Sequence, residues 1–86
     1  MGDKAMTMEI RYFAAAKAAT GVRTERVVCA PTDRISDLLR SLEESHPALQ
    51  AVLPRCSFLL DAVAVTRDRQ VGSAATLDVL PPFAGG

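Results

Sequence analysis

The sequence predicts one α+β domain, in which a long amphipathic helix covers one face of a mixed β-sheet. Three observations carry this prediction. Several short segments have the two-residue period of strands, whereas one central segment has the period of a helix. The strands precede and follow that helix and do not alternate with a series of helices. The chain has 86 residues, too few for a second domain, so residues 1–86 are expected to form a single unit.

The composition excludes several classes of protein. Ten basic residues balance ten acidic ones, so the clustered positive charge of a nucleic-acid-binding protein is not expected. No apolar run reaches the roughly 20 residues of a membrane-spanning helix, and residues 1–7 lack the apolar segment of a secretory signal. We therefore expect a cytoplasmic domain without nucleic-acid or membrane partners, and too small to contain a complete enzyme cleft.

The first third of the chain indicates a strand, a short helix and a second strand. After a flexible start over residues 1–6, residues 8–13 alternate between apolar and polar side chains, as a half-buried strand does. Residues 14–20 are mostly alanine and stop at Gly21, the residue preferred just beyond a helix end. Residues 22–29 are rich in β-branched side chains, which predicts the second strand.

The central helix has the strongest pattern in the sequence. Thr32 and Asp33 offer a cap for its first turn, and residues 45–47 end it at a proline. His46 lies at that end, where a positive charge interacts favourably with the helix dipole, and no catalytic role is assigned to it. Four apolar residues at helical spacing predict the buried stripe: Ile35, Leu38, Leu39 and Leu42.

The remaining segments predict short elements. Apolar residues between positions 49 and 53 suggest one further helical turn before Pro54. Residues 57–60 and 63–66 enclose Asp61-Ala62, which predicts a hairpin or two short strands. Residues 76–80 predict the last strand.

Two apolar residues are candidates for a partner interface. In the last strand, Leu80 shares a side with Asp78, because successive side chains of a strand point to opposite faces. If the first and last strands are neighbours, Phe13 and Leu80 emerge together on the sheet face away from the helix. Large apolar side chains on a polar face suggest a partner-binding patch. An aromatic residue at a strand end also fits the core, so both interpretations of Phe13 remain open.

The two cysteines do not predict a metal site. Cys29 and Cys56 are far apart in the sequence and lack the CxxC spacing of zinc and iron–sulfur ligands. Each is expected to act as a small buried hydrophobic residue, with a disulfide between them as the alternative.

The C-terminal segment carries the most specific pattern. Residues 81–86 cannot continue a strand, since proline lacks the N–H donor and glycine lacks stiffness, so an extended tail is expected. The ending Leu80-Pro81-Pro82-Phe83-Ala84-Gly85-Gly86 resembles that of the MoaD family, the small subunits of molybdopterin synthase. The opening Ile10-Arg11-Tyr12-Phe13-Ala14 is similar to the first strand of that family. The resemblance extends over about residues 7–86.

This resemblance implies a fold and a chemistry. The fold would be the ubiquitin-like β-grasp, with a mixed four- to five-stranded sheet on one main helix and short additional helices. A ubiquitin-activating-like enzyme would adenylate the carboxylate of Gly86 with ATP and Mg, and a sulfurtransferase would convert it to a thiocarboxylate. The large subunit of molybdopterin synthase, as a heterotetramer with this chain, would pass the sulfur to cyclic pyranopterin monophosphate. The chain itself would bind no cofactor or metal.

The tail residues suit that chemistry. The α-carboxyl of Gly86 is ionised at neutral pH and needs activation before sulfur can attack it. Gly85 and Gly86 lack a Cβ, so their backbone fits a narrow channel in a partner. Pro81 and Pro82 reduce the entropy lost when the tail is threaded, and Phe83 can bury apolar area. The resemblance assigns binding of the tail to Pro81, Pro82, Phe83, Ala84 and Gly85.

Three segments depart from the family pattern and leave the pathway open. They are Lys17-Ala18 in the first helix, Asp61-Ala62 in the hairpin and Ser73-Ala74-Ala75 before the last strand. Sulfur carriers for thiazole, tRNA thiolation or cysteine synthesis share the fold and the Gly-Gly ending, and among them is ThiS. A β-grasp module that binds partners without using its terminus is the alternative from another functional class.

Overall fold

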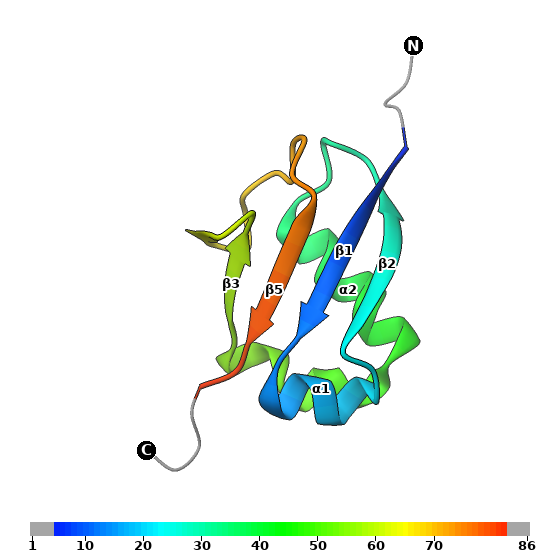
Figure 1. Cartoon of the computed structure of the whole chain (residues 1–86), viewed down its shortest axis with the longest axis vertical. Coiled ribbons are helices and arrows are strands. Elements are labelled where there is room, and N and C mark those ends of the chain that lie inside the picture. The colour runs from blue at the N-terminus through cyan, green and yellow to red at the C-terminus, as the bar shows by residue number, and fades with distance from the viewer. Residues whose placement is uncertain (1–4, 83–86) are drawn as a thin grey trace.

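The computed structural model describes residues 5–82 and contains two layers, a five-stranded sheet and helices packed on one of its faces (Figure 1). The elements follow one another as β1 (Met6–Tyr12), α1 (Ala14–Thr20), β2 (Thr24–Cys29), α2 (Ile35–Ser45), the 3₁₀-helices η1 (Pro47–Ala51) and η2 (Leu53–Arg55), β3 (Ser57–Leu60), β4 (Val63–Val65) and β5 (Thr76–Leu80). The predicted mixed sheet with one main helix is confirmed. Within the described residues, no helix is long and apolar enough to cross a membrane.

The first and last strands form the centre of the sheet. The strand order is β2-β1-β5-β3-β4. Strands β1 and β5 pair in parallel, whereas every other neighbouring pair is antiparallel. The C-terminal ends of β1 and β5 therefore point the same way, and Figure 1 shows both ends close to α1. This arrangement places Phe13 and the start of the tail at one end of the sheet.

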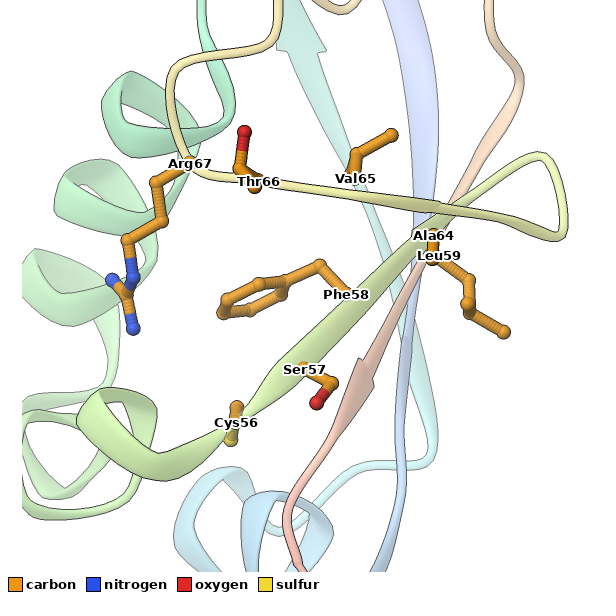
Figure 2. A pocket seen from close by; sticks show the side chains of 8 residues that line it. All are labelled: Cys56, Ser57, Phe58, Leu59, Ala64, Val65, Thr66 and Arg67. Atoms are coloured by element: carbon orange, nitrogen blue, oxygen red, sulfur yellow. The ribbon is translucent and has the colours of Figure 1, made fainter.

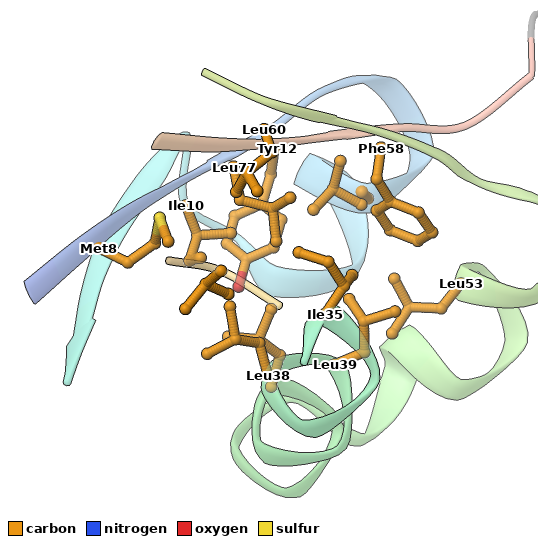
Figure 3. Packing of buried hydrophobic residues seen from close by; sticks show 14 of the residues in the cluster. Met8, Ile10, Tyr12, Ile35, Leu38, Leu39, Leu53, Phe58, Leu60 and Leu77 are labelled. Atoms are coloured by element: carbon orange, nitrogen blue, oxygen red, sulfur yellow. The ribbon is translucent and has the colours of Figure 1, made fainter. Parts of the chain in front are cut away.

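The core lies between the sheet and α2. Met8, Ile10 and Tyr12 of β1 are buried against the helix, as the alternation predicts. The predicted stripe of α2 meets them from the other side, and Figure 3 shows the two sets of side chains interleaved. Burying one such side chain contributes roughly 1.5–3 kcal/mol. The remaining buried members of the core come from the other elements: Ala16, Cys29, Leu49, Leu53, Phe58, Leu60, Val71, Leu77 and Val79.

The prediction that Thr32 and Asp33 cap α2 is wrong. The N-cap residue is Arg34, whose backbone N–H donates to the carboxylate of Asp37 at 2.8 Å. The Asp33 carboxylate accepts instead from the N–H of Ala30 at 2.9 Å and closes the turn after β2. A carboxylate in the first turn is favourable because the helix dipole is positive there.

Residues distant in sequence complete the N-terminus of α2. The N–H groups of Ile35 and Ser36 donate to the carbonyl oxygens of Arg69 and Arg67, each at 2.9 Å. The loop after β4 thus supplies the acceptors that a side-chain cap would otherwise provide. The start of the helix depends on this tertiary contact, which the local sequence does not reveal.

Several other element boundaries differ from the predictions; β1 ends at Tyr12 and β4 at Val65, each one residue earlier than expected. β1 begins at Met6, which pairs with Cys29, so the expected flexible start does not include residue 6. β2 begins at Thr24 because Gly21, with φ of 79°, and the residues after it turn the chain back from α1. The single turn expected before Pro54 is instead the two 3₁₀-helices, and the second contains Pro54.

Candidate functional site

The sheet face opposite α2 carries a row of side chains across all five strands. Arg11 pairs with Thr24 of β2 on one side and with Asp78 of β5 on the other. Asp78 pairs with Leu59 of β3, and Leu59 pairs with Ala64 of β4. Directly paired residues point to the same side of a sheet. This side is the outer face, because the alternate residues of β1 and β5 are buried against the helix.

Phe13 and Leu80 lie in the next row of the outer face. The N–H of Phe13 donates to the carbonyl of Val79 at 3.3 Å, and its extended backbone continues the alternation after Tyr12. Leu80 pairs with Ser57. The Phe13 side chain is 43% exposed, which excludes the core interpretation, while Leu80 is partly buried. Their function as a partner interface stays a prediction.

We define the outer patch as Phe13, Leu59, Ala64 and Leu80. Phe13 and Leu80 lie at the C-terminal ends of β1 and β5, and Leu59 and Ala64 lie in the preceding row, level with Asp78. Figure 2 shows Leu59 pointing away from the helices, whereas the neighbouring Phe58 points toward them. The outer patch therefore belongs to the solvent side of the molecule.

An ion pair borders the outer patch. The guanidinium of Arg11 donates to the Asp78 carboxylate through Nε at 2.5 Å and through Nη2 at 2.9 Å. The Asp78 side chain is only 9% exposed, whereas that of Arg11 is 42% exposed. Hydrogen bonding to Asp78 and its negative charge raise the pKa of Arg11. This pair was not predicted from the sequence, although Arg11 and Asp78 carry opposite charges in the predicted first and last strands.

The tail begins where β5 ends. Pro81 is partly buried and Pro82 is exposed, and neither belongs to a regular element. The predicted site residues Phe83, Ala84, Gly85 and Gly86 lie outside the described residues. The described structure thus fixes the position of the tail's first two residues beside the outer patch.

The hairpin between β3 and β4 is held by Asp61. Asp61 and Ala62 both have positive φ, of 47° and 70°, as the central residues of a type I′ turn require. The Asp61 carboxylate accepts from the N–H groups of Ala75 and Thr76, each at 2.9 Å, which lowers the pKa of Asp61. This carboxylate therefore connects the hairpin to the start of β5.

A groove of about 440 Å³ lies beside β3 and β4 (Figure 2). The Arg67 guanidinium lies over the Phe58 ring, 5.1 Å from its centroid, and donates to the Leu53 carbonyl at 2.5 Å. The Cys56 thiol donates to the Val52 carbonyl at 3.4 Å, and burial raises the pKa of that thiol. Since both polar side chains have internal partners, their arrangement indicates a structural role.

The cysteines are both free, so the disulfide alternative is wrong. Cys29 is buried as expected, and burial raises the pKa of its thiol too, which disfavours the reactive thiolate. Cys56 is only partly buried. Among residues 5–82, no group of three His, Cys, Asp or Glu side chains is placed to hold a metal ion.

His46 belongs to a polar cluster on the inner face of the sheet. Its Nε2 lies 2.8 Å from Oε2 of Glu25, and the Tyr12 hydroxyl donates to the same oxygen. The Tyr12 and His46 rings meet edge to face, with centroids 6.1 Å apart. Burial, followed by the hydrogen bond to Glu25, raises the pKa of Tyr12 far above its ordinary value. The cluster joins β1, β2 and the end of α2.

Comparisons with known proteins agree with this architecture. The model of the ThiS family matches residues 10–86. The molybdopterin synthase sulfur carrier subunit of Chlamydomonas reinhardtii is 28% identical over 83 residues, which cover 94% of this chain and all of the relative.

Two solved structures extend the comparison. SAMP1 from Haloferax volcanii is 27% identical, with a TM-score of 0.82 over 94% of this chain and 100% of its own. A chain from the complex of subunits 1 and 2 of molybdopterin-converting factor from Helicobacter pylori is 20% identical, with a TM-score of 0.64 and the same coverage. The fold is the ubiquitin-like β-grasp. Because the family match spans nearly the whole chain and includes its final residues, the chain belongs to the ThiS family.

Proposed function

We propose that this chain is the sulfur-carrier small subunit of molybdopterin synthase and acts in the cytoplasm. The proposal rests on one observation. Because β1 and β5 are parallel, Phe13, Leu80 and the start of the tail lie at the same end of the sheet. A partner that docks on Phe13 and Leu80 is then positioned to receive the tail. The full-length similarity to a relative described as a molybdopterin synthase sulfur carrier subunit supports this choice of pathway.

The reactive group in the proposal is the α-carboxylate of Gly86. It attacks the α-phosphorus of ATP, held with Mg by an adenylating enzyme, and pyrophosphate leaves. The outer sulfur of a persulfide on a sulfurtransferase then attacks the carbonyl carbon of the acyl-adenylate, and AMP leaves. A thiol reduces the resulting acyl disulfide, which releases the sulfurtransferase and leaves the thiocarboxylate on Gly86. Two successive thiocarboxylates convert cyclic pyranopterin monophosphate to the dithiolene of molybdopterin.

The catalytic residues for sulfur insertion would belong to the large subunit. The Helicobacter pylori structure is described as a complex of subunits 1 and 2, which supports a large subunit as the partner here. We propose a heterotetramer of two small and two large subunits. The outer patch would dock on the large subunit, since burying its apolar area stabilises the complex by roughly 25 cal/mol per Å².

The tail would bind in a narrow channel of the partner. Pro81 and Pro82 restrict the backbone at the point where it leaves the sheet, so less entropy is lost on binding. Phe83 and Ala84 would provide apolar contacts. Gly85 and Gly86 would pass the narrowest part, where a Cβ would collide with the wall.

Complementation tests the pathway. Expressed in a bacterial strain that lacks its own molybdopterin synthase small subunit, the chain is expected to restore the activity of a molybdenum enzyme such as nitrate reductase. The matched control is the chain without Gly86, which keeps the outer patch and is expected to restore nothing. Full activity of this shortened chain would support a non-covalent module and contradict the proposal.

A second candidate is a sulfur carrier or modifier of another pathway. The observation that favours it is the likeness to SAMP1, whose identity of 27% is close to the 28% of the molybdopterin synthase relative. The same chain is therefore tested in strains deficient in thiazole synthesis, tRNA thiolation and cysteine synthesis. Restoration of one of these and not of molybdenum-enzyme activity would replace our assignment with this candidate.

A further inference from the structure

Arg11 is the polar residue nearest the outer patch on its own strand, and its guanidinium has N–H donors that make no hydrogen bond to Asp78. An arginine side chain carries five N–H donors. The two hydrogen bonds to Asp78 use one donor on Nε and one on Nη2. The side chain is 42% exposed, so its remaining donors are available on the outer face.

Asp78 holds this guanidinium in place. A carboxylate that is only 9% exposed would be unfavourable without partners, because removing it from water costs free energy. The two-point contact with Arg11 compensates for this loss and fixes the plane of the guanidinium. A side chain already held in one conformation loses little entropy when a partner binds it. Asp78 is therefore a positioning residue for Arg11.

The position of Arg11 resembles that of an interface hot spot. Phe13 follows it by two residues, and Leu59 lies in the same row beyond Asp78. On the other side, Glu9 and Arg26 form a polar pair of neighbours in the next row. Arginine is enriched among the residues that dominate interfaces, especially where apolar contacts exclude water around it.

The charges around Arg11 favour a neutral acceptor. Asp78 balances the guanidinium, and Glu9 lies near enough to contribute to the raised pKa of Arg11. Arg26 lies opposite Glu9 on the same face, so two guanidiniums are matched by two carboxylates and no net positive charge remains to attract a partner carboxylate. A carbonyl oxygen can accept from the unused donors without needing such an excess of positive charge.

We propose that Arg11 is a specificity-determining residue of the docking surface, which donates its unused N–H groups to a carbonyl oxygen of the large subunit of molybdopterin synthase. The inference rests on the proposed function for the identity of the partner. It adds a directional contact to the outer patch, whose apolar residues alone would set orientation weakly. Asp78 contributes by holding Arg11 and makes no contact of its own.

The first experiment compares Arg11→Met with Arg26→Met. Both substitutions remove a guanidinium from the outer face, but Arg26 lies on β2 opposite Glu9, in the row farther from the outer patch. Calorimetric titration with the purified large subunit is expected to show about tenfold to a hundredfold weaker binding for Arg11→Met. Arg26→Met is expected to stay within about twofold of the original chain. Equal affinities of the two variants would overturn the proposal.

A charge exchange separates contact with the partner from a structural role. Arg11→Asp combined with Asp78→Arg restores an ion pair but moves the guanidinium to the neighbouring strand. The free chain is expected to unfold near the original temperature, while its affinity for the large subunit stays low. Recovery of affinity together with stability would show that Arg11 acts only through the fold, which contradicts the proposal.

If the double variant does not fold, Arg11→Lys distinguishes contact with the partner from a structural role instead. Lysine keeps the charge but lacks the planar fork that can bind Asp78 and a partner at once. Its affinity is expected to fall about tenfold with little change in unfolding temperature. An unchanged affinity would refute the role of the fork.

The salt dependence of binding tests whether the acceptor on the partner is neutral. The loss caused by Arg11→Met is expected to be the same at low and high salt, since a contact with a carbonyl is weakly screened. A loss that disappears at high salt would indicate a carboxylate and overturn this part of the inference. If the unaltered chain does not bind the large subunit, the proposed function itself fails. If it binds and the Arg11 variants bind equally well, only the inference fails.

Discussion

At the scale of single residues, Asp61 shows how one side chain stabilises two segments. Its carboxylate accepts the N–H groups of Ala75 and Thr76 and also lies 3.3 Å from the Thr76 hydroxyl. Its own backbone N–H donates to the Thr76 carbonyl at 3.0 Å. The hairpin and the start of β5 are thus joined by four hydrogen bonds at one residue.

We predict that Asp61→Asn reduces the dependence of stability on pH. The hydrogen bonds lower the pKa of Asp61 in the folded chain, so its charge stabilises the fold above the unfolded value of about 3.9. This stabilisation is lost as the pH falls through the lower, folded pKa. Asparagine accepts positive φ and keeps one acceptor oxygen. In urea unfolding, the two chains should differ at neutral pH and converge in acid. An equal difference at both pH values would contradict this account.

Ala62 has a backbone conformation that its side chain disfavours. Its φ of 70° lies in the left-handed region, where a Cβ is strained. Glycine at this second turn position removes the strain, and the Asp-Gly pair is preferred in type I′ hairpins. The same residue is exposed, so no packing is lost.

Ala62→Gly should therefore stabilise the fold. After the greater entropy of glycine in the unfolded chain is subtracted, we expect a gain of about 0.5–1 kcal/mol in the free energy of unfolding. Ala18→Gly is the matched control, since Ala18 is exposed in α1 and its replacement should cost about 1 kcal/mol. Destabilisation by both substitutions would mean that the turn is not strained.

At the scale of elements, hydrogen bonds between side chains connect β1, β2 and α2. Tyr12 is buried, and its hydroxyl shares the Glu25 carboxylate with His46. His46 is also the C-cap of α2, where its N–H donates to the Leu42 carbonyl at 2.8 Å. The cluster fixes the end of the helix over the sheet. His46 has the structural position expected of it, with a partner that the sequence did not identify.

Tyr12 should resist ionisation in the folded chain. An exposed tyrosine ionises near pH 10, but burial and Glu25 raise the pKa of Tyr12. Its contribution to stability is complete below about pH 10 and is lost as the pH rises above that value toward the folded pKa. The chain contains a single tyrosine, so ultraviolet absorbance reports on this residue alone.

Ultraviolet absorbance at alkaline pH measures the ionisation of Tyr12. Phenolate absorbance should appear only with alkaline unfolding, whereas the chain in urea should titrate near the ordinary value. Tyr12→Phe should retain the fold and lose this part of the alkaline dependence. Ionisation near pH 10 in a chain that remains folded would show that Tyr12 is accessible.

The accuracy of the predicted bounds differs among the elements. α1 and β5 have the predicted bounds because their signals are local, an alanine run ending at Gly21 and an apolar strand before Pro81. The start of α2 could not be predicted, since its first N–H groups bind the carbonyls of Arg67 and Arg69. Likewise, the Arg11–Asp78 pair depends on the register between two strands separated by most of the chain.

At the scale of the whole molecule, the small size fits the proposed role. Most apolar side chains of the described residues are used in one core between the sheet and α2, while the outer face retains the outer patch and, near the end of β2, the exposed Val28. In the proposed mechanism, nucleotide binding and catalysis belong to partners, so the chain needs only a docking surface and a tail. The sequence predicted where Phe13 and Leu80 would emerge, while the role of the tail came from its resemblance to a family.

Gly86→Val should separate docking from sulfur transfer. A β-branched side chain at Gly86 would obstruct the narrow approach to the terminal carboxylate. We expect the variant to bind the large subunit with nearly unchanged affinity but to accept little or no sulfur. Normal thiocarboxylate formation would contradict the argument for a narrow channel.

The central claim is that the carboxylate of Gly86 carries sulfur. It is tested most directly by the mass of the intact chain after incubation with its adenylating enzyme, its sulfurtransferase loaded with sulfur as a persulfide, a thiol reductant, ATP and Mg. We predict a mass increase equal to the exchange of one oxygen for sulfur, located by fragmentation at Gly86 and absent from the chain without that residue. An unchanged mass, with both partner enzymes active on another carrier, would contradict the account.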